Sequence, residues 1–255
     1  MSACYLTPDW PVHAAVRAAF TLRTGGVSRA PFASLNVATH VGDAPRAVAE
    51  NRARVREVLS LRAEPAWLDQ VHGNVVADLD AGSEAVHGAD AAVTRASGCV
   101  LAIQVADCLP VLFAAQDGSA VGAAHCGWRG LSSGVLEATV RALGLDAGKL
   151  SAWLGPAIGP AAFEVGAQVR DAYLAQDARA AVAFTANARG RWQCDLYELA
   201  RQRLNALGVQ AVFGGGLCTH SDPARFFSFR RDGRCGRMAA LIWIHAADGR
   251  MGAPC

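Results

Sequence analysis

The sequence lacks any segment typical of export or membrane insertion. Its opening residues, MSACYLTPDWPVHAAVRAAF, contain no basic stretch followed by an apolar core, so they do not resemble a signal peptide. The longest apolar run, near residues 100–115, is too short for a membrane span and is interrupted by Gln104, Asp107 and Pro110. We therefore expect a cytoplasmic protein with no membrane partner.

The chain also has little net charge. Of its 255 residues 18% are charged and 52% are hydrophobic, and the formal net charge is +2. This balance gives no reason to expect a nucleic-acid partner, and the composition is that of a folded domain. One dense basic cluster interleaves with phenylalanines and suits either an anionic ligand or a solvated turn before a terminal strand. Its arginines are Arg230, Arg231, Arg234 and Arg237, and its aromatic residues are Phe226, Phe227 and Phe229.

No Cys-x-x-Cys pair and no regular cysteine framework is present. In a reducing compartment most of the eight cysteines are then expected to be small buried hydrophobes, with one or two available as ligands or nucleophiles. They stand at positions 4, 99, 108, 126, 194, 218, 235 and 255.

The sequence contains no repeat, low-complexity tract or linker, so we predict a single domain over residues 1–255. Strand and helix patterns mix without strict alternation, which favours an α/β (α+β) sandwich of mixed β-sheets flanked by helices. After an initial strand and a Gly-rich turn within the first forty residues, helices are predicted at 45–60, 131–143, 165–176 and 194–207. Strands are predicted at 67–79 (interrupted at 70–73), 99–115, 120–125, 151–158, 209–213 and 238–245.

Three short segments place a His or Cys where a predicted strand ends beside a Gly or Pro. They are residues 69–73 with His72, residues 105–110 with Cys108, and residues 123–130 with His125. Taken singly, each of these side chains is more commonly structural. Strand ends on one edge of a sheet can converge, however, and functional residues are often held on loops by such a scaffold.

Two imidazoles and one thiolate make a three-ligand set of the kind found in catalytic zinc sites, which keep a fourth position for water or substrate. Copper also accepts these ligands. Asp107 is costly to bury unpaired, so we expect it to support a ligand histidine. The ligands are not spaced as in a zinc finger, so the coincidence of three such residues, rather than their spacing, indicates the site.

The sequence resembles the bacterial polyphenol-oxidase, or laccase-domain, family, whose members are largely regarded as zinc-dependent purine nucleoside enzymes. The resemblance covers nearly the whole chain. It rests on Thr24-Gly-Gly-Val-Ser28, Ser34-Leu-Asn36, His40-Val-Gly-Asp43, Asn51-Arg52, Gln70-Val-His-Gly73, Ala106-Asp-Cys-Leu-Pro110, His125 with Gly127-Trp-Arg-Gly130, Leu154-Gly-Pro-Ala-Ile-Gly159, and Phe227-Ser228 with Arg230-Arg-Asp232.

The resemblance implies that His72, Cys108 and His125 bind the metal, Zn²⁺ or alternatively Cu²⁺. It implies phosphorolysis of adenosine, inosine and S-methyl-5′-thioadenosine, and hydrolytic deamination of adenosine, with purine nucleosides and phosphate as partners and a homodimer possible. In the family Ala usually precedes the Gly-Trp-Arg motif, where this chain has Cys126. Packing is the simplest role for that thiol.

Arg23, beside its Gly-Gly turn, and Arg129 are the candidates for binding phosphate, since guanidinium and backbone amides suit phosphate oxygens. Three alternatives stay open. One is a copper polyphenol oxidase, although seven histidines in the whole chain make a multicopper cluster implausible. Another is an amidase that edits peptidoglycan precursors, with Cys108 as nucleophile and His125 as its base. The third is a non-catalytic module stabilised by metal.

Overall fold

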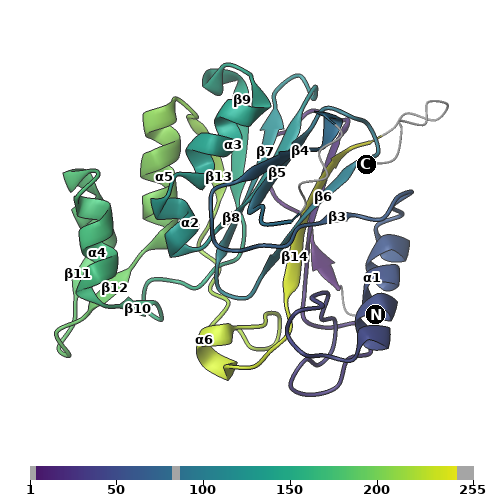
Figure 1. Ribbon diagram of the computed structural model, residues 1–255, viewed down its shortest axis with the longest axis horizontal. Coiled ribbons are helices and arrows are strands. Elements are labelled where there is room, and N and C mark those ends of the chain that lie inside the picture. The colour runs from purple at the N-terminus through teal and green to yellow at the C-terminus, as the bar shows by residue number, and fades with distance from the viewer. Residues whose placement is uncertain (1–3, 82–86, 246–255) are drawn as a thin grey trace.

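Two β-sheets lie face to face, with helices on both outer faces (Figure 1). This computed structural model describes residues 4–81 and 87–245. The predicted sandwich of mixed sheets flanked by helices is confirmed. The prediction of a single domain covers residues 1–255, and part of that range lies outside the described residues. Cys255 also lies outside them.

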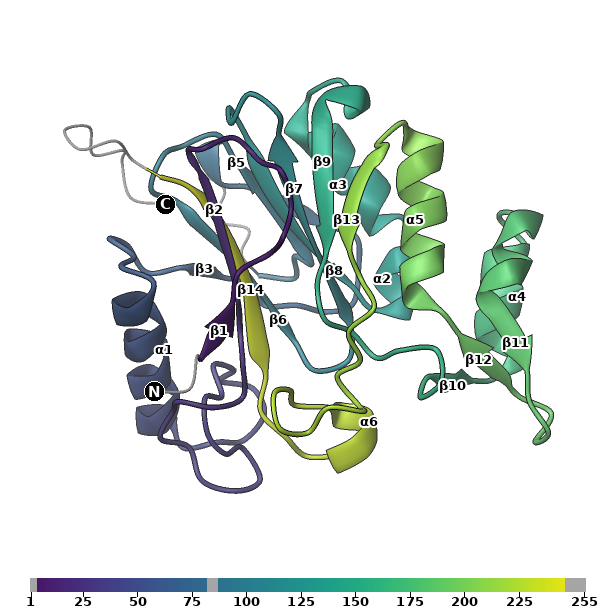
Figure 2. The ribbon, with the colours of Figure 1, turned by 180° about the vertical axis from the view of Figure 1, so that it is seen from behind.

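The first sheet has five strands, and in Figure 2 it lies between α1 (Pro45–Val58) and the second sheet. All its pairs are antiparallel except the one between β3 and β6. Its order is β1 (Tyr5–Leu6), β2 (Val16–Thr21), β14 (Met238–Ile244), β6 (Val100–Val105) and β3 (Ala66–Trp67).

The second sheet has six strands and is also mixed, with parallel pairs at both of its edges. Its central strands β7 and β8 are antiparallel neighbours, and both are buried along their whole length. Its order is β13 (Ala211–Gly214), β9 (Leu150–Leu154), β7 (Leu109–Ala115), β8 (Val121–Cys126), β5 (Ala91–Thr94) and β4 (Val76–Asp78).

Apolar clusters fill three layers. The central one, between the sheets, includes Ile103, Leu112 and Ile242. A second covers the outer face of the six-stranded sheet beneath α2 (Trp128–Ser132), α3 (Val135–Leu143) and α5 (Leu196–Leu207). A third lies between the five-stranded sheet and α1 (Pro45–Val58). Both faces of both sheets are therefore covered, which explains the nearly continuous apolar character of their central strands.

The apolar run predicted as one strand at 99–115 is two strands in different sheets. The chain leaves β6, passes through Ala106, Asp107 and Cys108, and enters β7 of the facing sheet. Asp107 takes a φ of 93°, a left-handed conformation that ends the first strand. The residues predicted as one strand at 67–79 divide in the same way, because β3 and β4 also belong to different sheets.

Beyond the sandwich, a small three-stranded sheet projects to one side together with α4 (Ala167–Leu174) (Figures 1 and 2). Its strands, which the sequence did not predict, are β10 (Glu164–Val165), β12 (Trp192–Cys194) and β11 (Phe184–Ala186). The expected turn within the basic cluster contains a short helix, α6 (Phe229–Asp232). Short 3₁₀ segments occur at Leu79–Ala81, Ala147–Lys149 and Ala178–Ala183. Among the described residues no helix is long and apolar enough to cross a bilayer.

Candidate metal centre

The structure brings His72, Cys108 and His125 together. One ligand atom from each lies within 4.8 Å of the others, and within the described ranges no other group of three His, Cys, Asp or Glu side chains is arranged in this way. His125 is the next-to-last residue of β8, whereas His72 and Cys108 lie on the two connections that cross between the sheets. The convergence expected from the strand ends is therefore present.

Asp90, a residue that we did not single out from the sequence, organises two of these three residues. Its carboxylate accepts backbone N–H bonds from Val71, His72 and Gly73 at 3.1, 2.9 and 2.6 Å. His72 itself has a φ of 63°, which is uncommon for a residue other than glycine. Three charge-assisted bonds to one buried carboxylate hold the loop in this conformation.

The same carboxylate fixes the orientation of His125. The Nδ1 atom of His125 is 2.8 Å from Asp90 Oδ1, and both side chains are almost completely buried. Burial raises the pKa of Asp90, but the hydrogen bonds from His125 and Gly73 outweigh burial and hold that pKa below its usual value. Because Nδ1 of His125 is engaged in this way, Nε2 is the nitrogen available to a metal, as in many metal-ligand histidines.

Cys108 and His125 form a polarised pair. Burial raises the pKa of the Cys108 thiol, but His125 and His72 outweigh burial and lower it to about 6. Burial lowers the pKa of His125, whereas Cys108 and Asp90 raise it to about 9. Near neutral pH the metal-free pair is therefore a thiolate beside an imidazolium, so Cys108 carries the charge that a metal ligand or a nucleophile needs.

The three donors fit a transition metal. Cys108 Sγ and His72 Nε2 are 3.9 Å apart. A tetrahedral zinc ion with bonds of about 2.0–2.3 Å separates its ligands by roughly 3.3–3.7 Å, so the three donor atoms, which lie within 4.8 Å of one another, would have to move closer together around the ion. One thiolate and two imidazoles suit zinc or copper better than the hard cations magnesium and calcium.

Two glycines of the Gly-Trp-Arg-Gly turn leave room for the segments of His72 and Cys108. A Cβ at Gly127 would come within 2.9 Å of Cys108 Sγ and 3.1 Å of His72 Cδ2. A Cβ at Gly130 would come within 2.8 Å of the carbonyl oxygen of Gly73. The turn after His125 therefore packs directly against the segments of His72 and Cys108, and a larger residue at Gly127 would displace these two side chains.

Two cavities of about 230 Å³ each adjoin the centre, and both are lined by His72 and Cys108. The first, which we call the apolar pocket, is lined in addition by Ala106, Asp107, Trp128, Arg129, Ile158, Phe163, Leu196, Phe229 and Arg230. The second, which we call the polar pocket, is lined in addition by His40, Gln70, Gln104, Val105, Ala106, His125, Phe229 and Arg237. The group of His72, Cys108 and His125, which we call the metal group because its side chains could hold a metal ion, thus adjoins both cavities.

The structure separates the two arginines predicted to bind phosphate. Arg129 lines the apolar pocket, with its guanidinium 4.4 Å from the Trp128 ring. Arg23 lines neither pocket. Its guanidinium donates to the carbonyl oxygens of Ala33 and Pro223 and lies over the ring of Phe227, so it holds loops together.

Asp107 and Cys126 have other roles than ligand support. The Asp107 oxygens accept from Thr219 Oγ1 at 2.6 Å and from the Arg230 backbone N–H at 2.6 Å, so the expectation that Asp107 supports a ligand histidine is wrong. Asp90 is the carboxylate that supports His72 and His125. Cys126 is fully buried in the cluster beneath the helices, and burial raises the pKa of its thiol, which agrees with packing.

Comparison with known proteins places these features in a family. Residues 17–245 match the model of the family described as multi-copper polyphenol oxidoreductase laccase. The chain is 56% identical over 241 residues to a purine nucleoside phosphorylase of Pseudomonas aeruginosa, covering 94% of this chain and 98% of that protein. It is 48% identical over 239 residues to purine nucleoside phosphorylase YfiH of Escherichia coli, with the same shares covered.

Two crystal structures share the fold. One is a Neisseria meningitidis protein with a TM-score of 0.91 and 45% identity, covering 96% of this chain and all of that one. The other is YlmD from Geobacillus stearothermophilus, with a TM-score of 0.86 and 33% identity, covering 96% of this chain and 98% of that one.

Proposed function

The chain belongs to the multi-copper polyphenol oxidoreductase laccase family, and from that premise we propose that it is a metal-dependent purine nucleoside phosphorylase. The observation that carries the proposal is the His72–Cys108–His125 group beside the apolar pocket. A relative that is 56% identical in sequence over 94% of this chain is named a purine nucleoside phosphorylase. We propose adenosine, inosine and S-methyl-5′-thioadenosine as substrates, and zinc as the metal.

His72, Cys108 and His125 would hold the zinc ion, with Asp90 orienting His125 and bracing the loop of His72. When bound, zinc supplies Lewis acidity at the position that the protein ligands leave for water or substrate. The name of the family suggests copper oxidation. A multicopper centre needs several ligand groups, however, and the described residues provide one such group of three.

The apolar pocket suits a purine base. Trp128, Phe163 and Phe229 line it and offer flat surfaces, and aromatic stacking stabilises a bound base by about 1–3 kcal/mol. The Asp107 carboxylate, another lining residue, is already satisfied by Thr219 and the backbone of Arg230, so it is held in place beside the pocket. Excluding water from this pocket would strengthen the polar contacts made to the substrate.

In phosphorolysis an oxygen of hydrogen phosphate forms a bond to C1′ of the ribose while the bond from C1′ to the purine nitrogen breaks. The purine leaves with the electron pair and takes up the proton of hydrogen phosphate, so the products are ribose 1-phosphate and the free base. We also propose hydrolytic deamination of adenosine, in which a water oxygen replaces the amino group and ammonia leaves.

The test is an assay of metal-defined protein against adenosine with and without phosphate. Adenine and ribose 1-phosphate that appear only with phosphate support phosphorolysis. Inosine that appears without phosphate supports deamination. Absence of both products, from protein that carries about one zinc per chain, contradicts the proposal, and several coppers per chain contradict the choice of metal.

One observation favours a second candidate, a Cys-His hydrolase acting on peptidoglycan precursors. Cys108, His125 and Asp90 are arranged as nucleophile, base and orienting carboxylate, and the pKa of Cys108 is lowered to about 6. A metal on Cys108 blocks that role. Amide hydrolysis by metal-free protein, inhibited by added zinc, would support the hydrolase over the phosphorylase.

A further inference from the structure

The polar pocket carries a positive charge that no carboxylate in its wall balances. Arg237 and His40 line it, and none of its lining residues is Asp or Glu. Gln70 and Gln104 supply the other polar groups. A concave site with a guanidinium, an imidazole and amides is chemically suited to an anion with several oxygens.

Arg237 is anchored in a way that leaves part of its guanidinium free for a ligand. Its Nη1 donates to the carbonyl oxygens of Cys235 and Gly236 at 2.9 and 3.1 Å, and the group lies 5.7 Å from the Phe229 ring centroid. Its backbone N–H is fixed by Asn36 at 2.9 Å. Within the described part of the chain, Nε and Nη2 have no hydrogen-bond partner and the guanidinium has no carboxylate partner, so two donors stay available.

One residue of the pocket wall, Gln104, also holds a buried acceptor. The side-chain amide of Gln70 pairs with the backbone of Gln104. Its Nε2 donates to the Gln104 carbonyl oxygen at 2.9 Å, and its Oε1 accepts from the Gln104 N–H at 2.8 Å. The side chain of Gln104 donates through Nε2 to Leu68, which fixes its amide orientation. Its Oε1 is buried without a hydrogen-bond partner among the described residues. A buried acceptor in this condition is costly unless a ligand or water donates to it.

We propose that Arg237 and His40 form the site for the phosphate co-substrate. The purine would occupy the apolar pocket across the metal group. This inference rests on the proposed phosphorolysis, and it names the residues that supply the second substrate.

The placement of the two pockets agrees with the chemistry. Direct displacement at C1′ brings the incoming oxygen to the side opposite the departing purine. The polar and apolar pockets share four lining residues, His72, Ala106, Cys108 and Phe229, and otherwise extend to different residues, so a ribose beside the metal group can face both. Arg129 is the rival anchor, but it lies over Trp128 in the apolar pocket, whose wall also includes the Asp107 carboxylate.

Steady-state kinetics of the zinc-loaded protein test the assignment. Arg237→Gln should raise the KM for phosphate about 10–100-fold, the effect expected from losing charge-assisted hydrogen bonds, and should change the KM for adenosine less than about twofold. Arg237→Lys should recover part of the loss. Arg234→Gln is the matched control, because Arg234 comes from the same segment, donates to the Gly42 carbonyl and lines neither pocket. It should leave both constants unchanged. A larger rise in the phosphate KM for Arg129→Gln than for Arg237→Gln would overturn the assignment.

Calorimetric titration with inorganic phosphate gives a readout that does not depend on turnover. Wild-type protein and Arg234→Gln should bind phosphate, and Arg237→Gln should bind it at least about tenfold more weakly. If wild type cleaves no nucleoside, the proposed function fails, yet loss of phosphate binding in Arg237→Gln would still support the site. Equal phosphate affinity in wild type and Arg237→Gln would overturn the site even if phosphorolysis is observed.

Discussion

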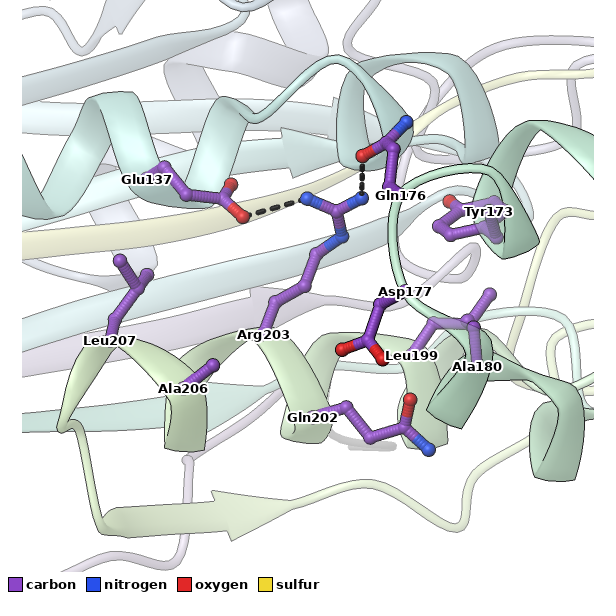
Figure 3. A pocket seen from close by; sticks show the side chains of 10 residues that line it. All are labelled: Glu137, Tyr173, Gln176, Asp177, Ala180, Leu199, Gln202, Arg203, Ala206 and Leu207. Carbon is purple, nitrogen blue, oxygen red and sulfur yellow. Dashed lines mark hydrogen bonds and ion pairs between the residues drawn. The ribbon is translucent and has the colours of Figure 1, made fainter.

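Two regions of this molecule are hollowed to a similar extent but differ in how their charged side chains are satisfied. A cleft of about 270 Å³ lies among α3, α5 and the segment that follows α4 (Figure 3). Arg203, in this cleft, donates to Glu137 at 2.7 Å and to Gln176 at 2.6 Å and lies over the ring of Tyr173. One oxygen of Glu137 has no hydrogen-bond partner in the described residues, but its carboxylate is paired with Arg203.

The pockets beside the metal group are slightly smaller, at about 230 Å³ each, and their groups are less satisfied. Arg237 has donors to spare, Gln104 has an unused acceptor, and Cys108 is held as a thiolate. The larger cavity is therefore not the better site. Polar groups kept without an internal partner are costly, and this cost is met most often where a ligand binds.

Replacing one of the three proposed metal ligands should have the largest effect on zinc binding and turnover. Cys108→Ala should abolish zinc binding and reduce nucleoside turnover to background while the fold survives, because the side chain lies at the end of a connection rather than within a strand. Zinc content, adenosine turnover and circular dichroism measure these outcomes, and His72→Ala and His125→Ala should behave alike. Retention of nucleoside activity by Cys108→Ala would show that the site is wrongly assigned.

Asp90→Asn should have the next largest effect. An amide cannot accept all four hydrogen bonds that the carboxylate accepts, so the loop of His72 and the orientation of His125 should both loosen. Zinc affinity should fall about 10–100-fold, as for other residues that orient metal ligands. Asp80→Asn is the control. Asp80 also accepts hydrogen bonds, from Thr94 and Arg95, but lies away from the metal group, so its replacement should lower stability and leave zinc affinity unchanged.

Zinc affinity should also depend on pH, with a sign set by His125. The pKa of His125 is raised to about 9 and that of Cys108 is lowered to about 6 in the metal-free protein. Between these values zinc must displace one proton, from His125, so the dissociation constant should fall about tenfold per pH unit as pH rises, and then level above pH 9. Competition titrations with a chelating dye at several pH values measure the slope. A flat profile would contradict the thiolate–imidazolium pair.

A replacement in the larger cleft should have the smallest effect on zinc content and turnover. Arg203→Met removes the partner of Glu137 but keeps an apolar stem over Tyr173. Because the pair is partly exposed, we expect the free energy of unfolding to fall by about 1–2 kcal/mol. Zinc content and turnover should stay at the wild-type values. If turnover fell with unchanged zinc content, the distinction drawn between the two regions would be wrong.

The sequence singled out the three candidate ligands but not the carboxylate that positions two of them. His72, Cys108 and His125 stand beside Gly or Pro at visible breaks in apolar patterns. Asp90 also directly precedes a buried strand, and the cost of burying an unpaired carboxylate was the signal that could have identified it. Arg237 was visible within the basic cluster, but nothing in that pattern distinguishes it from Arg234, which binds a loop carbonyl.

The boundary between β6 and β7 could not be read from hydrophobicity. Both strands are buried on two faces, so neither shows the alternation that would mark where one ends and the other begins. The contacts of Arg23 could not be read from the sequence for a related reason. A Gly-rich turn with an arginine is the same pattern whether the guanidinium meets a phosphate or two backbone carbonyls, and only the folded chain decides between them.

The crossings at His72 and Cys108 have a consequence for the order of assembly. The strand β14 inserts between β2 and β6, so the five-stranded sheet cannot be complete until Ile244 has been synthesised. The ligands are all present by residue 125, yet two of them are set by connections into that unfinished sheet. Metal should therefore be acquired late, after the ribosome has delivered the last strand. A bound ion would then report that both sheets have closed, and a nascent chain would remain without tight metal binding until its fold is nearly whole.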